Sequence, residues 1–182
     1  SSDITTLNKR INSNEIRAKN ISSIINTLAT KKSLSESELT MFYTLNTSLG
    51  FESYFIPETS TFRQLESNGD GALIKDKVLR DVLYEYYTLN ERNEKNTETS
   101  IQLYQHNLVT PNIMKQLMTG DYLHSIIGSS LNRSKLDLES LRQNSDYMLA
   151  LVVKKEMGDI QKGKYENIKF KAEELLNLLE SK

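Results

Sequence analysis

Histidine offers the first chemistry to test, because an imidazole can bind a metal ion or carry a proton. His124 lies three residues after Asp121, a spacing that places a carboxylate and an imidazole on one face of a helix. A di-iron bundle needs two such pairs and two further inward-facing glutamates. The other histidine, His106, has no carboxylate three residues before or after it. We therefore predict no metal site and a surface or connector position for His124.

The segment from Glu66 to Gly71 resembles the opening of a calcium-binding loop. Side-chain oxygens occupy its first, third and fifth positions, and glycine occupies the sixth. The twelfth position should hold a glutamate that binds calcium through both oxygens, but it holds Lys77. A cation at that position opposes binding. The sequence therefore favours a helix C-cap and a turn over a calcium site.

Nucleophilic and phosphate-binding motifs are absent from the sequence. The segment Gly128-Ser129-Ser130 lacks the second glycine of a nucleophile elbow. Phosphate loops and dinucleotide fingerprints are also missing. The chain has no cysteine, which excludes disulfides, thiolate nucleophiles and cysteine-based metal sites. We predict a non-enzymatic chain with no catalytic residue and no cofactor.

Tyrosines are concentrated at Tyr84, Tyr86 and Tyr87, with Arg80 and Arg92 nearby. Aromatic rings and guanidinium groups together can form a ligand surface. Such residues more often pack at a helix interface, with their hydroxyls at its rim. With two aromatic residues of the preceding connector, they give a candidate partner or ligand surface made of Tyr54, Phe55, Arg80, Tyr84 and Tyr87.

The composition restricts the class of protein further. The net charge of −1 provides no basic field to attract nucleic acid or an anionic membrane. No apolar run approaches the roughly 20 residues of a membrane-spanning helix. Only two prolines and seven glycines occur in 182 residues, too few for the many turns of an all-β fold. We expect a helical chain with no nucleic-acid partner.

Apolar residues three and four positions apart predict a first long helix. Asn14 is the one polar interruption of its stripe, and Lys31 and Lys32 are expected in its last turn, where cations suit the helix dipole. The apolar members of the stripe are Ile4, Leu7, Ile11, Ala18, Ile21, Ile25 and Leu28.

Two capping signals place the next long helices. Ser35 and Glu38 have the spacing of a capping box, which predicts a helix over about residues 36–49. Asp76 is the expected cap of the longest helix, over residues 76–109. The ends of its stripe are apolar, and its polar middle, expected at the surface or at a wet seam, contains Asn90, Asn93 and Thr97.

Four further helical segments are expected after residue 109. Thr110-Pro111 restarts a helix, and a short helix is expected over residues 122–127. One stripe runs from about Ser134 to Gly158 through Leu138, Leu141, Ser145, Met148 and Val152. A separate helix is expected after Gly163, with a stripe of Tyr165, Ile168, Ala172, Leu175 and Leu179.

These segments predict an all-α fold, a long-helix antiparallel bundle with short capping helices, in a single domain of residues 1–182. An extended coiled coil is the alternative for some stripes.

Residues 50–75 interrupt the periodicity and form an expected lid-like connector. Thr59 or Ser60 is expected to cap a short helix that Ser67-Asn68-Gly69 terminates. Arg80 is expected to hydrogen-bond the free carbonyls at the end of that helix. The side chains expected to pack over one end of the bundle are Phe55, Phe62, Leu65 and Leu73.

The connector and the start of the following helix resemble a bacterial family of uncharacterised single-pass membrane proteins, which carry a domain of unknown function. The shared pattern is an aromatic, a proline, a short helix ending in Ser-x-Gly, an apolar step, Leu-Arg and a Tyr-Tyr pair. It is carried here by Tyr54-Phe55-Ile56-Pro57, Ser60-Thr61-Phe62-Arg63-Gln64-Leu65-Glu66-Ser67-Asn68-Gly69, Ala72-Leu73-Ile74-Lys75-Asp76-Lys77-Val78-Leu79-Arg80 and Tyr86-Tyr87.

The resemblance implies a helical domain on the periplasmic side of the inner membrane, held by a transmembrane anchor upstream of residue 1. We therefore expect an interaction, scaffold or sensory domain with an unknown protein partner, for which a homo-oligomer is possible. The alternative is a small-molecule-binding bundle, or an enzyme with an aromatic-lined pocket.

Overall fold

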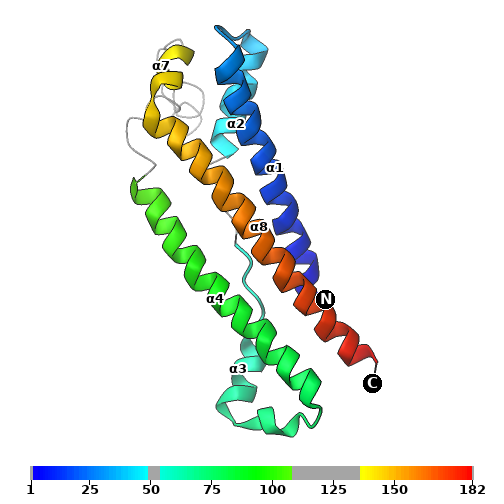
Figure 1. Cartoon of the computed structure of the whole chain (residues 1–182). Helices are drawn as coiled ribbons and strands as arrows, with labels where there is room; N and C mark the ends of the chain where they lie inside the picture. The colour runs from blue at the N-terminus through cyan, green and yellow to red at the C-terminus, as the bar shows by residue number, and fades with distance from the viewer. Residues whose placement is uncertain (1, 49–53, 108–135, 182) are drawn as a thin grey trace, which may run out of the picture. The chain divides into compact units, whose positions relative to one another are not determined.

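The computed structural model describes residues 2–48, 54–107 and 136–181, and every regular element in these ranges is helical (Figure 1). The all-α prediction is confirmed. The elements are α1 (Ser2–Thr30), α2 (Glu36–Ser48), α3 (Ser60–Ser67), the 3₁₀ helix η1 (Asp70–Leu73), α4 (Lys77–Asn107), α7 (Leu138–Gln143) and α8 (Ser145–Glu180).

The chain divides into two compact units, each with its own apolar cluster. Unit 1 comprises residues 1–15, 53–99 and 159–182, and unit 2 comprises residues 16–52 and 100–158. Parts of α1, α4 and α8 belong to each unit. The expectation of a single domain stays a prediction.

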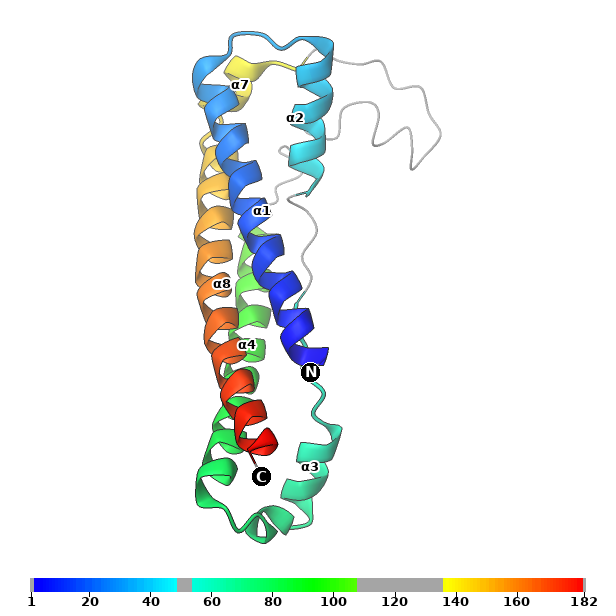
Figure 2. The same ribbon diagram turned by 90° about the vertical axis from the view of Figure 1, so that its right-hand side faces the viewer.

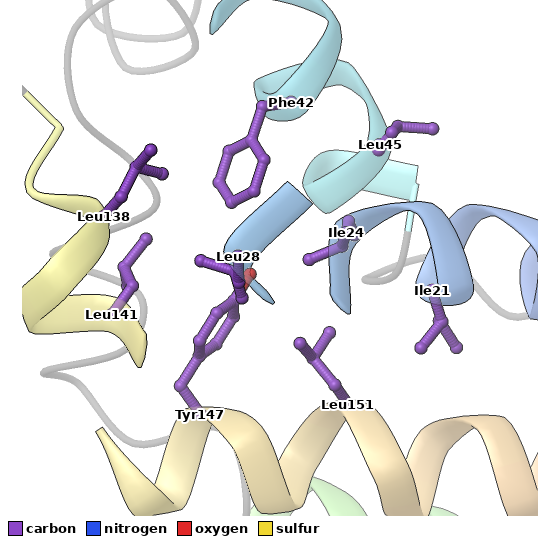
Figure 3. Close-up of a cluster of buried hydrophobic side chains, with 9 residues drawn as sticks. All are labelled: Ile21, Ile24, Leu28, Phe42, Leu45, Leu138, Leu141, Tyr147 and Leu151. Atoms are coloured by element: carbon purple, nitrogen blue, oxygen red, sulfur yellow. The ribbon is translucent and has the colours of Figure 1, made fainter. Parts of the chain in front are cut away.

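In unit 2, four helices contribute to a cluster of nine buried hydrophobic side chains. Figure 3 shows these side chains converging from α1, α2, α7 and α8. The cluster contains Ile24, a residue outside the predicted stripe, whereas Ile25 of the stripe is only half-buried and packs against it. The members are Ile21, Ile24, Leu28, Phe42, Leu45, Leu138, Leu141, Tyr147 and Leu151.

The junction between α1 and α2 is closed by polar groups. The capping box is confirmed, because the Ser35 N–H donates to Glu38 Oε2 at 2.8 Å and the Glu38 N–H donates to Ser35 Oγ at 3.4 Å. Lys31 lies beyond the end of α1 rather than in its last turn, which corrects the prediction. Instead, Arg142 supplies the cation there and donates to the carbonyls of Leu28 and Lys31 at 2.7 and 2.9 Å.

The stripe predicted from about residue 134 is broken between α7 and α8. Asn144 ends α7 and caps α8, because its Oδ1 accepts from the N–H of Tyr147 at 3.0 Å. The restart shifts the buried face of the helix. Tyr147 and Leu151 are therefore buried, while Val152, predicted to be buried, is 48% exposed.

α8 then continues through both glycines that were expected to separate two helices. The prediction of a helix end near Gly158 and a new start after Gly163 is wrong. A glycine inside a helix costs only about 1 kcal/mol relative to alanine. Contacts on either side of the glycines outweigh that cost, with Leu151 buried before them and Tyr165 after them.

In unit 1, parts of α1, α4 and α8 lie alongside one another (Figure 2). The connector that precedes α4 belongs to the same unit. The predicted stripe of the last helix is buried at Tyr165, Ile168 and Ala172, but Leu179 is 54% exposed. The apolar cluster of this unit is formed by Leu7, Phe55, Tyr86, Tyr165, Ile168 and Ala172.

Candidate interaction surface

The connector enters unit 1 through Phe55, which is buried. Its backbone N–H donates to Tyr165 Oη at 3.2 Å, and its ring packs edge-on against the Tyr165 ring with centroids 6.4 Å apart. Tyr54 is half-buried, and Ile56, which precedes Pro57, is exposed. Alternate residues of this extended segment therefore face opposite sides, as the strand-like backbone before a proline requires.

α3 is held against α4 by one aromatic side chain. Phe62 is the one buried residue of this helix. Its ring stacks on Tyr87 with centroids 4.0 Å apart and an interplanar angle of 11°, and it meets Tyr84 edge-on at 5.2 Å. Phe62, predicted to pack over one end of the bundle, is buried against α4.

The start of α3 is capped differently from the prediction. Thr59 occupies the N-cap position, but its side chain makes no capping hydrogen bond. Glu58 does so instead, accepting from the Ser60 N–H at 3.3 Å and from Ser60 Oγ at 2.7 Å. These hydrogen bonds from Ser60 lower the pKa of the Glu58 carboxyl.

The end of α3 is the predicted C-cap and turn. The N–H groups of Asn68 and Gly69 donate to the carbonyls of Gln64 and Glu66. Gly69 has φ of 72°, which favours glycine. Gly71 is buried against α4, and a Cβ atom there would overlap Tyr84 Oη. The segment whose sequence resembles the opening of a calcium loop therefore forms a turn that packs against Tyr84.

Two hydroxyl groups of the tyrosine cluster form hydrogen bonds within unit 1. Tyr86 Oη donates to Asp3 Oδ2 at 2.8 Å, and Tyr87 Oη donates to the Glu58 carbonyl at 3.1 Å. Burial raises the pKa of Tyr86 above its ordinary value, and the hydrogen bond to Asp3 raises it further. The pKa of Tyr87 is raised by burial and then by the charges of Asp3 and Glu58. Both phenols therefore stay protonated at neutral pH and serve as structural donors.

Three large aliphatic side chains of the connector and the start of α4 are exposed to solvent. Leu73 was expected to pack into the lid, but it is 74% exposed, which contradicts that prediction. Ile56 is 75% exposed, and Val78, in the first turn of α4, is 59% exposed. Leu65 is half-buried. Sequence reasoning missed the exposure of Ile56 and Leu73, because an irregular segment has no periodicity to assign its sides. We call Ile56, Leu73 and Val78 the exposed aliphatic residues.

Basic side chains lie close in the sequence to the exposed aliphatic residues Leu73 and Val78. Lys75 and Lys77 are exposed and Arg80 is half-buried. Within the described ranges, none of the three is in an ion pair, and the Arg80 guanidinium makes no hydrogen bond. The expectation that Arg80 binds the carbonyls at the end of α3 is therefore wrong. Those carbonyls accept from backbone N–H groups of the turn instead.

Of the five residues predicted for a partner or ligand surface, the structure brings Tyr84 and Tyr87 together through Phe62, and Phe55 joins the apolar cluster. Tyr54 is half-buried, and the half-buried Arg80 forms no ion pair within the described ranges. Sequence reasoning missed Tyr165 as the partner of Phe55, because 110 residues separate them. It also missed Asp3 and Glu58, which carry no local signal for their tyrosine contacts.

Several sequence candidates lie outside the described residues, namely Asp121, His124 and the segment Gly128-Ser129-Ser130, and the side chain of His106 is likewise not described. In the described part of the chain, no three histidine or acidic side chains are grouped so that they could hold a metal ion. None of the described helices combines the length and apolar character that crossing a membrane requires.

No protein-family model matches the chain, and no curated protein or solved structure is significantly similar to it.

Proposed function

We propose that this chain is a non-enzymatic helical interaction domain that binds a partner protein outside the bacterial cytoplasm, where an anchor preceding residue 1 holds it to the inner membrane. The location rests on the family resemblance of the connector. The binding rests on one observation, the solvent exposure of the aliphatic side chains of Ile56, Leu73 and Val78. Ile56 and Leu73 have the highest exposed fractions recorded for large hydrophobic side chains in the described part of the chain.

Ile56 and Leu73 lie on a connector whose backbone is held in place by buried side chains. Phe55, which precedes Ile56 in the sequence, and Phe62, on the same connector, are both buried. Their ring contacts with Tyr165 and Tyr87 hold the connector backbone in place. A preformed backbone lowers the ordering cost of binding. Exposed apolar side chains on such a segment are typical of interaction sites.

The charged residues near Leu73 and Val78 in the sequence indicate the kind of partner that this segment fits. Lys75, Lys77 and Arg80 surround Leu73 and Val78 in sequence and leave their positive charges without ion pairs in the described ranges. Asp76, whose Oδ1 accepts from the Leu79 N–H at 3.0 Å as the cap of α4, and the exposed Asp81 lie in the same stretch, so its three positive charges exceed its two negative charges by one. We therefore propose a partner with an apolar groove bordered by acidic side chains.

The test uses photo-crosslinking amino acids at positions 56 and 73 in the producing bacterium, with position 19 of α1 as an exposed control. We expect one crosslinked protein at positions 56 and 73 and none at position 19. Ile56→Ser with Leu73→Ser, and separately Lys75→Glu with Lys77→Glu, should each weaken binding of that purified partner at least tenfold. Stability should be unchanged, because substitutions at exposed positions usually change it by less than about 0.5 kcal/mol.

Three outcomes contradict the proposal. Equal crosslinking at position 19 indicates non-specific contact, and crosslinks only between copies of this chain indicate a homo-oligomer. The third is binding of the purified chain to vesicles containing anionic lipid, if the Lys75→Glu and Lys77→Glu pair abolishes it. That result would show that these residues bind a membrane surface instead of a protein.

A further inference from the structure

A layer of buried polar side chains crosses unit 1 at the level where α4 meets α8. Asn90, Asn93 and Thr97 of α4 are each less than one-tenth exposed. Gln161 of α8 joins two of them, because its Nε2 donates to Asn93 Oδ1 at 3.0 Å and its Oε1 accepts from Thr97 Oγ1 at 3.4 Å. The polar middle predicted for the longest helix is thus buried at a helix interface.

The next residue of α8 connects to a different helix. Lys162 Nζ lies 2.8 Å from Glu15 Oε1 of α1, and the adjacent Asn14 is only 6% exposed. Two consecutive residues, Gln161 and Lys162, therefore reach α4 and α1 at one level of unit 1.

We propose that this polar layer, rather than the apolar cluster beside it, fixes the axial register of α8 against α4 and α1 within unit 1. The inference is independent of the proposed function. Apolar contact is non-directional, so the cluster around Tyr165 and Ile168 rewards many alignments. Hydrogen bonds require short distances and good angles, and a buried polar group without a partner is unfavourable. Buried polar residues set register in other helix assemblies at a loss of stability.

The nearest competing alignment is a slip of α8 by one helical turn, about 5.4 Å. It would bring Gln161 towards Asn90, whose Oδ1 is buried with no hydrogen-bond partner in the described ranges and whose Nδ2 donates to the Tyr86 carbonyl at 2.8 Å. That slip would leave Thr97 without Gln161 and separate Lys162 from Glu15. The observed register satisfies all three contacts, and the slipped one satisfies fewer.

Register can be read by crosslinking, because the chain has no native cysteine. Lys171 Nζ lies 2.9 Å from Glu85 Oε2, so a Glu85→Cys and Lys171→Cys pair reports the observed register. Asp81 lies one turn before Glu85, so an Asp81→Cys and Lys171→Cys pair reports the slipped register. A bismaleimide chosen to span the first pair should crosslink only that pair in the parent protein.

The test removes the layer in two ways. Gln161→Leu alone leaves Asn93 and Thr97 buried without their partner, so its urea midpoint should fall below the parent's. Adding Asn93→Leu and Thr97→Val should raise the midpoint to or above the parent's value, while crosslinking of the slipped pair appears at one-fifth or more of the native yield. A variant with Gln161→Met and Lys162→Met, which keeps side-chain volume, should show the same second crosslink if the triple variant folds poorly.

Crosslinking confined to the native pair in every folded variant overturns the proposal, because the apolar packing would then set the register. A triple variant less stable than Gln161→Leu also overturns it, because the layer would then be a source of stability.

Discussion

Replacing Phe62 with alanine tests how the connector is attached to unit 1. The ring is 7% exposed, and Phe62 is the one buried residue of the eight-residue α3. Truncating a buried phenylalanine usually costs about 3–5 kcal/mol. Two ring contacts, with Tyr87 and Tyr84, account for about 1–3 kcal/mol of this, at about 0.5–1.5 kcal/mol each. Phe62→Leu, which keeps apolar volume but loses both contacts, should therefore lose only that part.

Two measurements distinguish local detachment from global unfolding. Urea denaturation followed by circular dichroism reports global stability, and amide hydrogen exchange of α3 reports its opening. A loss of about 3 kcal/mol corresponds to at least a hundredfold faster exchange. Leu73→Ala is the matched control in the same segment, because Leu73 is 74% exposed and should change stability by less than about 0.5 kcal/mol. If Phe62→Ala exchanges and unfolds like Leu73→Ala, the connector is a loose loop and the packing argument fails.

Three further outcomes follow from other contacts. Gly158→Ala and Gly163→Ala should each stabilise the protein by about 0.5–1 kcal/mol in thermal or urea unfolding, because both lie inside α8 and an added Cβ meets no atom within 4 Å; destabilisation would show that a glycine is needed there. Arg142→Ala should destabilise unit 2 by about 1.5–3 kcal/mol through loss of its bonds to two carbonyls of α1, with Arg142→Lys intermediate, and unchanged urea midpoints would refute it. Glu38 accepts from backbone and side-chain donors, which lower its pKa from 4.5 to about 2; its stabilising effect is complete above about pH 4.5 and lost as pH falls towards 2. The parent protein should therefore lose protection of its α2 amides as the pH falls between those values, and Glu38→Gln should not. Identical profiles for the two proteins would contradict the assignment.

Local signals in the sequence were reliable where both partners lie within one turn. Ser35 and Glu38 form the predicted capping box, and Asp76 caps α4 through the Leu79 N–H. These bonds depend only on the geometry of three consecutive peptide units. The helical class was likewise predictable, because apolar spacing of three and four residues persists over long segments.

Tertiary contacts decided the features that the sequence could not predict. Arg142 caps α1 from 114 residues away, a pairing without a local pattern. The glycines of α8 were interpreted as helix ends because propensity considers neither Leu151 nor Tyr165, whose burial on each side keeps the helix intact.

The candidate surface stays a prediction, and the contacts of its residues were predictable only in part. The aromatic residues of the candidate surface were recognisable from their residue types. Their packing inside unit 1 was not predictable, because it depends on the contacts of Phe62 and Gly71 with Tyr84. The aliphatic residues that reach solvent, Ile56 and Leu73, belong to an irregular segment where neither period two nor period 3.6 applies. Their side could be assigned only from the backbone path.

The single-ring attachment of α3 has a consequence for how such a chain can diversify. Because Phe62 and Gly71 hold α3 and the following turn against α4, exposed positions of the segment such as Ile56 and Leu73 can change without disturbing α1, α4 or α8. If the proposed function holds, mutations at these positions would alter partner binding while the long helices keep their sequence. On the proposed function, the connector would separate two selective pressures, one for folding and one for recognition, and relatives that bind different partners should differ most at Ile56, Leu73 and Val78.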